Sequence, residues 1–361
     1  MKITILFLGR NGAGPRYAFK MVEAISKSYP SIKLQVVLSS YIDNISDWKS
    51  IEGLELISVS TYNSSLQFFK EYLKYGKWKK IASKILGFKP DYLYIPMISL
   101  LNPLIIYHLK TIKIIYTLHD PIEHIGEKNV FVEAIRKYEL KKAYKVVLLN
   151  NFFKKYVIEH YRIRENDIIE IPHAAFFSSI LPKLNTEFRN KILFVGRIEK
   201  YKGVGLLIDA FSSLLEYNDD IKLTIAGKGD LSQYNKLDLL GDRVNVINGW
   251  LSDQEIDILI RDHDFVVLPY IDASQSGVVP VVFANQRIVI ATDKGALKEQ
   301  VPLDIGYIVE ANTESIVSSI LQIYESGIQN LNSRNSEAYN YALKNLTWEA
   351  SAKILIDSIY G

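Results

Sequence analysis

The sequence contains no cysteine among its 361 residues. Disulfides and thiolate-bound metal sites are therefore excluded, and a reducing compartment fits this composition without being required by it. Long apolar runs are also lacking. No stretch approaches the roughly 18 apolar residues that a membrane-spanning helix needs, and the run Ile3–Leu8 is too short for the hydrophobic region of a signal peptide. We therefore expect a cytoplasmic protein, soluble or at most peripheral on the inner face of the cell membrane.

Acidic residues are scarce in the first half of the chain. Residues 1–180 contain 26 Lys and Arg but only 16 Asp and Glu, whereas residues 181–361 contain 17 and 24. The formal net charge of +3 hides this asymmetry. A basic half joined to an acidic half predicts that one of them faces a polyanion, such as a membrane, lipid phosphate or nucleic acid.

Short apolar runs alternate with segments of helical periodicity, and the length of the chain allows two domains of ordinary size. This alternation predicts an α/β fold with a doubly wound parallel sheet in each domain. We expect a first domain over residues 1–173, a linker over 174–189, a second domain over 190–345 and a final helix within 346–361. The expected strands are residues 2–8, 33–38, 91–95, 113–118 and 144–149, and then 192–195, 223–226, 244–247, 265–269 and 288–292.

Two cations stand on one short turn in the second domain. The apolar run Ile192–Val195 is typical of a buried strand, and apolar residues at helical spacing resume after Gly203. The turn between them carries Arg197 and Lys202 and should lie at the carboxyl edge of a parallel sheet, where α/β proteins bind ligands. These cations suit a diphosphate, because a guanidinium binds it bidentately and an ammonium as a point charge. The alternative is a solvated turn with ordinary surface cations.

The sequence of this turn closely resembles a known signature. Residues 196–203 read Gly-Arg-Ile-Glu-Lys-Tyr-Lys-Gly, which is similar to the GR-x4-KG pattern of the retaining GT-B glycosyltransferases of family 4 (glycosyl transferases group 1). The resemblance implies two Rossmann-like domains facing a cleft, with the C-terminal helix crossing back onto the first. It also implies that Arg197 and Lys202 are catalytic and hold the diphosphate of a nucleotide-sugar donor, without a metal or any other cofactor.

Three glycines follow the first expected strand, at positions 9, 12 and 14. Glycine lets the backbone approach a ligand closely where the next helix begins. Their order is G-x-x-G-x-G, which differs from the dinucleotide fingerprint, and no acidic residue follows the second strand to hold a ribose. NAD binding is therefore disfavoured. The loop also resembles the glycine loop of GT-B enzymes, which implies a donor-binding position for Gly12.

A histidine stands at the end of another expected strand, in the sequence His119-Asp120-Pro121. Pro121 prevents the strand from continuing. From its chemistry alone, His119 either caps the strand through its neighbours or faces a ligand. The segment resembles the donor-sugar histidine of the family, which implies a catalytic position for His119 near the reacting carbon of the sugar.

Other loops of the second domain also resemble donor-binding parts of this family. They follow the strands at 223–226, 244–247 and 265–269, and the last of them opens a helix that runs through Ala284. Amide groups at the start of that helix are expected to point at an anion. The donor-binding residues implied in this domain are Gly227, Gly229, Leu251, Asp272, Ser276, Gly277 and Val278.

The family pattern is broken in the last of these loops. The family carries two glutamates eight positions apart, and the matching residues here are Asp272 and Pro280, or the residues one position later. On either alignment the second carboxylate, which in the family holds the donor ribose, is absent. An inactive relative is therefore an alternative, although the retained cationic turn and His119 argue against it.

Residues 64–89 are dense in lysine and aromatic residues and have helical periodicity. Lys70, Lys74 and Lys77 share one helix face, with Phe69 and Leu73 alongside, and one interpretation is a solvated face over a core stripe. The other is a surface that docks on anionic lipid, with Trp78 and the tyrosines at the interface. No nucleic-acid motif accompanies these residues, so a nucleic-acid partner is disfavoured. The lysines that would make the docking surface are Lys70, Lys74, Lys77, Lys79 and Lys80.

We therefore expect a retaining glycosyltransferase that moves a hexose from a nucleotide-diphosphate sugar to a saccharide or lipid-linked saccharide, in cell-envelope or polysaccharide assembly. Its acceptor is expected on the first domain, and an anionic membrane surface is a further expected partner. Two alternatives remain. One is a sugar-nucleotide 2-epimerase of the same fold, which needs acid and base carboxylates that the sequence does not reveal. The other is a non-catalytic partner subunit of a transferase.

Overall fold

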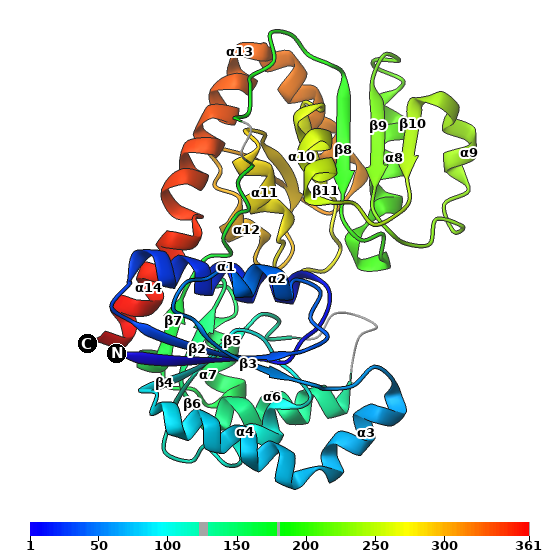
Figure 1. Ribbon diagram of the computed structural model, residues 1–361. Coiled ribbons are helices and arrows are strands. Elements are labelled where there is room, and N and C mark those ends of the chain that lie inside the picture. The colour runs from blue at the N-terminus through cyan, green and yellow to red at the C-terminus, as the bar shows by residue number, and fades with distance from the viewer. Residues whose placement is uncertain (123–128, 179–180, 361) are drawn as a thin grey trace. The chain divides into compact units, whose positions relative to one another are not determined.

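The structure is a computed structural model that describes residues 1–122, 129–178 and 181–360. It contains two α/β units, each built on a sheet in which all paired strands are parallel (Figure 1). The first unit comprises the described residues of 1–121, 128–172 and 348–361, and the second comprises Ile122 and the described residues of 173–347. The expected fold class of two doubly wound parallel sheets is confirmed.

The first unit has a seven-stranded sheet of order β3-β2-β1-β4-β5-β6-β7. Its central strands are apolar on both faces because helices cover both sides of the sheet. The strands are β1 Lys2–Phe7, β2 Lys33–Ser39, β3 Glu55–Val59, β4 Tyr92–Ile95, β5 Lys113–Leu118, β6 Ala143–Leu148 and β7 Ile168–Glu170. The helices are α1 Ala13–Ser28, α2 Ile45–Lys49, α3 Ser65–Leu73, α4 Tyr75–Phe88, α5 Asn102–Ile106, α6 Val130–Lys142, α7 Lys154–Tyr161 and α14 Trp348–Tyr360, with a 3₁₀ turn η1 at Glu165–Asp167.

The second unit has a six-stranded sheet of order β10-β9-β8-β11-β12-β13, so its first strand lies in the middle. The strands are β8 Lys191–Val195, β9 Lys222–Ala226, β10 Val244–Ile247, β11 Phe265–Leu268, β12 Val289–Thr292 and β13 Tyr307–Val309. The helices are α8 Val204–Leu214, α9 Lys236–Leu240, α10 Asp253–Arg261, α11 Val278–Ala284, α12 Leu297–Gln300 and α13 Thr313–Asn345, with 3₁₀ turns η2 Lys200–Lys202 and η3 Gly241–Arg243. Ser252 caps α10 and forms a capping box with Glu255.

The last helix, α14, returns to the first unit and packs beside α1 (Figure 1). The Trp348 ring meets the Tyr17 ring edge to face at 5.2 Å, and the Tyr92 hydroxyl donates to the Ile359 carbonyl at 2.9 Å. Before this return, α13 bends at Gly327, whose backbone leaves helical geometry. The C-terminal helix is therefore part of the first unit, as the fold class implies.

The segment before β8 is tied to the second unit by a buried polar network. The Asp264 carboxylate accepts the backbone amides of Arg189 and Lys191, and the Asn185 side-chain amide donates to it at 3.3 Å. The buried Arg287 guanidinium donates to the Asn185 side-chain oxygen and to backbone carbonyls around it. These bonds place the start of β8, so the end of the expected linker 174–189 belongs to the packed second unit.

Residues 64–89 form two helices, α3 and α4, which meet at Lys74. The Trp78 side chain is buried in the core, and its indole N–H donates to the Glu71 carbonyl oxygen at 2.8 Å. The expectation that Trp78 lies at a membrane interface is therefore wrong. None of the helices in the described part of the chain combines the length and apolar character needed to cross a bilayer.

Candidate functional site

The cationic turn lies between β8 and α8, at the carboxyl edge of the second sheet. Gly203 ends the 3₁₀ turn η2 with a φ of 68°, a conformation that disfavours side chains other than hydrogen. A Cβ atom at this position would lie 1.8 Å from the Pro269 carbonyl oxygen. Only glycine therefore allows the turn to press against the end of β11, and this contact fixes the position of Lys202.

Lys202 is half-buried between two aromatic rings. Its Nζ lies 3.7 Å from the centroid of the Tyr270 ring and 5.1 Å from that of Tyr201. Such cation–π contacts hold an ammonium in place without neutralising it. Among the described residues, no carboxylate lies within ion-pair distance of Lys202. Its positive charge is therefore positioned by the fold and remains available to an anion.

Arg197 is exposed, and its side chain is oriented by the same aromatic residue. Its Nη2 donates a hydrogen bond to the Tyr201 hydroxyl at 3.0 Å. The Tyr201 carbonyl accepts the Ile271 amide at 2.8 Å, so Tyr201 joins the cationic turn to the chain after β11. The structure thus brings Arg197 and Lys202 together around Tyr201.

Two predicted donor-binding glycines lie against the cationic turn. A Cβ on Gly227 would be 1.9 Å from the Gly196 carbonyl oxygen, and a Cβ on Gly229 would be 2.2 Å from that of Ile198. The Ile198 amide also donates to the Lys228 carbonyl at 2.9 Å. The backbone after β9 therefore packs directly on the backbone after β8, which requires the absence of side chains at both glycines.

The turn before α11 differs from expectation in how its amides are used. The Ser276 amide donates to Gln300 Oε1 at 2.7 Å, and the Val278 amide donates to Ser276 Oγ at 3.3 Å. Gln300 also donates to the Ser276 carbonyl, and the Ser276 hydroxyl lies 3.1 Å from that of Tyr270. Two of the three amides expected to face an anion thus already have partners within the protein. Ser276 and Val278 shape this turn, and Gly277 is the exposed residue at its tip.

Asp272 and Leu251 lie outside the cationic turn. Asp272 is half-buried and follows β11, with its amide 3.4 Å from the Tyr201 carbonyl. Leu251 follows β10 and packs partly buried against the core of the second unit. Pro280 lies within α11 and is buried, so neither this position nor Val281 supplies a carboxylate. The absence of the second family glutamate is therefore not compensated within α11.

Gly12 and His119 lie in the first unit. Gly12 precedes α1 with a φ of 86°, and a Cβ there would meet nothing within 4 Å. The half-buried His119 ring packs edge to face on Tyr17 at 4.6 Å, and its Nε2 lies 2.8 Å from the Pro96 carbonyl. Because a carbonyl only accepts, Nε2 carries the proton and Nδ1 of the neutral ring is an acceptor. Burial lowers the pKa of His119, which favours this neutral form.

Three residues of the second unit belong to this region but were not found from the sequence. Tyr270 lies under Lys202, Gln300 bonds the Ser276 turn, and His173 faces Gly277, where a Cβ would be 3.7 Å from its Nε2. Each meets a partner far away in the sequence, so no local spacing indicates these contacts.

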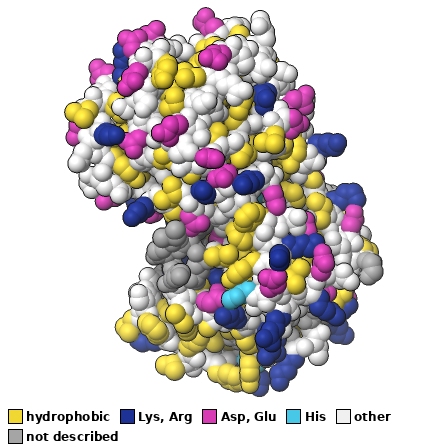
Figure 2. Space-filling model, turned by 180° about the vertical axis from the view of Figure 1, so that it is seen from behind, with side chains coloured by type: hydrophobic (Ala, Val, Ile, Leu, Met, Phe, Trp, Pro, Cys, Tyr) yellow, Lys and Arg dark blue, Asp and Glu magenta, His cyan; other side chains and the backbone are white. Residues whose placement is uncertain are grey.

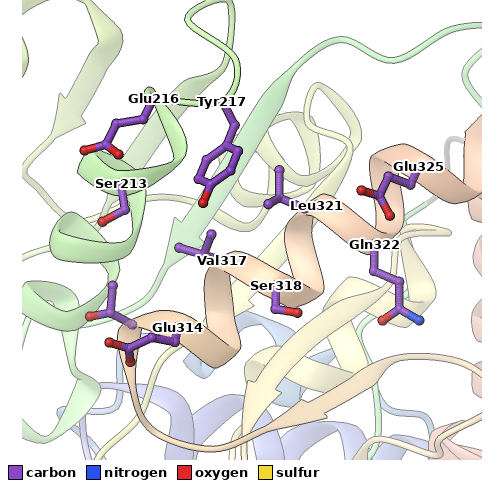
Figure 3. A pocket seen from close by; sticks show the side chains of 10 residues that line it. Ser213, Glu216, Tyr217, Glu314, Val317, Ser318, Leu321, Gln322 and Glu325 are labelled. Atoms are coloured by element: carbon purple, nitrogen blue, oxygen red, sulfur yellow. The ribbon is translucent and has the colours of Figure 1, made fainter.

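A separate hollow of about 630 Å³ lies between the end of α8 and α13. Figure 3 shows Glu216 and Tyr217 on one side and Glu314, Gln322 and Glu325 along α13. Its described lining carries three carboxylates and no lysine or arginine, so it would repel a diphosphate. It includes none of the predicted site residues.

Comparison with known proteins identifies the region that carries the cationic turn. Residues 189–326 match the model of the family described as glycosyl transferases group 1. The second unit is a glycosyl transferases group 1 domain. This match includes Arg197, Lys202 and every donor-binding residue predicted in the second unit.

Two curated relatives and one solved structure extend the comparison. The chain is 29% identical over 165 residues to a phosphatidyl-myo-inositol mannosyltransferase of Mycobacterium leprae, covering 43% of this chain and 44% of the relative. It is 23% identical over 207 residues to a phosphatidylinositol N-acetylglucosaminyltransferase subunit of Schizosaccharomyces pombe, covering 55% and 45%. The structure of Anabaena HepE in complex with UDP matches with a TM-score of 0.75 and 15% identity over the whole of both chains.

The structural match shows that the chain has the GT-B fold, as the resemblance of the cationic turn implied. The curated relatives are matched over less than half of their own length, 44% and 45%. The family of the second unit and the fold of the chain follow from these comparisons.

Proposed function

We propose that this chain is a retaining glycosyltransferase that moves a hexose from a nucleotide-diphosphate sugar to a saccharide or lipid-linked saccharide. The observation that supports it best is Lys202, an ammonium that is held over Tyr270 and has no carboxylate partner among the described residues. When the glycosidic bond of the donor stretches, negative charge grows on the departing diphosphate. Lys202 and Arg197 would stabilise that charge without moving into place, because the fold already positions both side chains.

The other predicted residues complete the donor site in this proposal. Gly227 and Gly229 bring the backbone close to the cationic turn, and Gly277 offers its exposed tip to a phosphate oxygen. Nδ1 of His119 would accept a hydrogen bond from a sugar hydroxyl of the donor. Leu251 and Asp272 would border the base and ribose of the donor. Gly12 would be a donor-binding residue of the first unit. No metal or other cofactor takes part.

The acceptor is proposed to be bound by the first unit and to be lipid-linked. Two relatives are named for transfer to phosphatidylinositol lipids, and the chain is basic over residues 1–180. An acceptor of this kind would place the enzyme at the inner face of the cell membrane, in the assembly of cell-envelope lipids or polysaccharides.

Slow hydrolysis of the donor tests this function directly. The full chain is incubated with UDP-, GDP-, ADP- and dTDP-hexoses, and products are separated by chromatography. Release of free sugar and nucleoside diphosphate from one donor is the expected result. Conversion of the sugar into its 2-epimer would identify an epimerase instead. No turnover and no binding of any nucleotide sugar would contradict the proposal.

A non-catalytic partner subunit is the second candidate, and one observation favours it. The positions that match the second family glutamate are Pro280 or Val281 in α11, and neither side chain can accept hydrogen bonds from a ribose. In that case the chain would bind donors without hydrolysing them. Measuring binding and hydrolysis on the same preparation therefore separates the two functions.

A further inference from the structure

Helix α3 turns an apolar face outward. Leu66 and Phe69 each retain 68% of their accessible surface and Leu73 retains 83%. Their spacing of three and four residues puts them on one face of the helix. A surface helix ordinarily presents polar side chains there. These three residues, which we call the α3 apolar face, are therefore unexplained by the folding of the first unit.

The opposite side of α3 already attaches the helix to the first unit. Phe68 meets the Tyr62 and Tyr72 rings at 5.0 and 5.5 Å, and the Tyr72 hydroxyl donates to the Leu100 carbonyl. Ser64 caps the helix by accepting the Gln67 amide. Because these contacts hold α3 in place, its outer residues are free to serve a partner.

The charge around the α3 apolar face has one sign. Residues 64–89 contain seven lysines and a single acidic residue, Glu71. Glu71 is buried, and Lys74 and Lys77 pair with it at 2.7 and 2.5 Å. The remaining lysines of this segment have no ion-pair partner among the described residues. Those that are exposed are Lys70, Lys79, Lys80, Lys84 and Lys89.

We infer that the α3 apolar face inserts into the interface of an anionic lipid bilayer, with Lys70, Lys79 and Lys80 binding its headgroups. Leucine and phenylalanine beside lysine is the composition of a helix that lies in a membrane surface. Figure 2 shows Lys and Arg side chains next to hydrophobic ones over the surface of the first unit. A second copy of the chain fits less well, because its own lysines would oppose these lysines.

This inference rests on the proposed function, because docking would place the chain on the membrane that contains the proposed lipid-linked acceptor. It also changes the docking residues expected from the sequence. Lys74 and Lys77 are engaged with Glu71 and Trp78 is buried, so the apolar contribution comes from Leu66, Phe69 and Leu73.

Co-sedimentation with vesicles tests the inference on the full chain. Vesicles of phosphatidylcholine alone are compared with vesicles that also contain phosphatidylglycerol. We expect binding to the second kind only. A triple variant, L66S/F69S/L73S, should lower the partition coefficient roughly 100-fold, since each residue exposes a large apolar side chain to be buried. Neutralisation of three charges in K70Q/K79Q/K80Q should lower it by a similar factor, because each lysine near the bilayer contributes about fivefold.

The matched control is L239S/L303S, which removes two apolar side chains that are 85% and 73% exposed in the second unit. This variant should bind vesicles like the unaltered chain. Circular dichroism checks that all variants fold, as expected for residues with little packing. Vesicle binding that is unchanged in L66S/F69S/L73S, equal on neutral vesicles or absent altogether would overturn the inference. So would a concentration-dependent dimer that this variant abolishes, because the face would then bind a second copy.

Donor hydrolysis without vesicles distinguishes the two proposals. If L66S/F69S/L73S loses vesicle binding but hydrolyses the donor normally, membrane docking is separate from the donor site, as proposed. If the unaltered chain binds anionic vesicles but hydrolyses no donor, the proposed function fails and the docking surface stands.

Discussion

The two cations proposed to bind the donor lie on one short turn of the second unit. The lysines proposed to bind lipid are instead spread along α3 and α4 of the first unit. Lys202 is fixed over Tyr270 and Arg197 is bonded to Tyr201. In contrast, Lys70, Lys79 and Lys80 are exposed and have no ion-pair partner among the described residues. A few fixed cations suit the recognition of one diphosphate at a defined position. Several exposed lysines without ion-pair partners suit an extended surface, where total charge matters more than exact geometry.

Loss of a fixed cation should have the largest effect. Arg197→Ala or Lys202→Ala is expected to lower donor turnover about 10²–10³-fold, or roughly 3–4 kcal/mol in transition-state stabilisation. Steady-state kinetics of donor hydrolysis measures this effect. The matched control is Lys200→Ala, because Lys200 is an exposed lysine on the same turn. This substitution should leave donor turnover nearly unchanged. Comparable rates for Lys200→Ala and Lys202→Ala would show that the contacts of Lys202 with the aromatic rings give it no special role.

The prediction of this turn from the sequence succeeded for a physical reason. In a parallel sheet, a turn that connects the end of a strand to the following helix must lie at the carboxyl edge of the sheet. The use of the Ser276 amide could not be predicted in this way. Its partner Gln300 is 24 residues away and reaches it only after two strands have paired.

The docking surface could also be predicted only in part from the sequence. Helical periodicity over residues 64–89 indicated Lys70 and Phe69 but could not show that the helix divides at Lys74. That division turns Trp78 into the core and leaves Leu73 outside. Burial of one side of a helix depends on what packs against it, and this information is not local in the sequence.

A buried carboxyl group of the first unit, Glu139, should make the stability of the protein depend on pH. Glu139 is fully buried, beside Asn102 and Tyr116. Burial raises the pKa of Glu139 to about 8, from an ordinary value of 4.5. Between these values the unfolded chain loses this proton while the folded chain keeps it. Glu139 therefore lowers the free energy of unfolding as pH rises through this window, by at most about 1.4 kcal/mol per pH unit.

Glu139→Gln tests this effect, because glutamine keeps the shape and stays neutral. Urea unfolding from pH 5 to pH 8 should show the variant gaining stability relative to the unaltered chain, by about 1–3 kcal/mol in total. The difference between the two chains cancels the other titrating groups. A difference that does not change with pH would mean that Glu139 is solvated in the folded protein.

The smallest effect is expected at His119. His119→Ala should lower donor turnover about three- to tenfold, the contribution of one neutral hydrogen bond to the sugar. Its effect on affinity for the free nucleoside diphosphate should be smaller, because that product lacks the sugar. His108→Ala provides the control, since His108 packs on Tyr75 and Tyr107 and has no proposed role. Equal losses of turnover and product affinity would show general damage to the site.

Lys202 is proposed to bind the diphosphate of a nucleotide donor. Isothermal titration calorimetry with nucleoside monophosphates and diphosphates of uridine, guanosine and adenosine tests it most directly. We predict that the unaltered chain prefers one diphosphate over its monophosphate by about 10- to 100-fold, as a charge-assisted hydrogen bond contributes roughly 1.5–3 kcal/mol. Lys202→Ala should remove most of this preference and leave monophosphate affinity nearly unchanged. Equal weakening of both ligands, or an unchanged preference in the variant, would contradict the assignment.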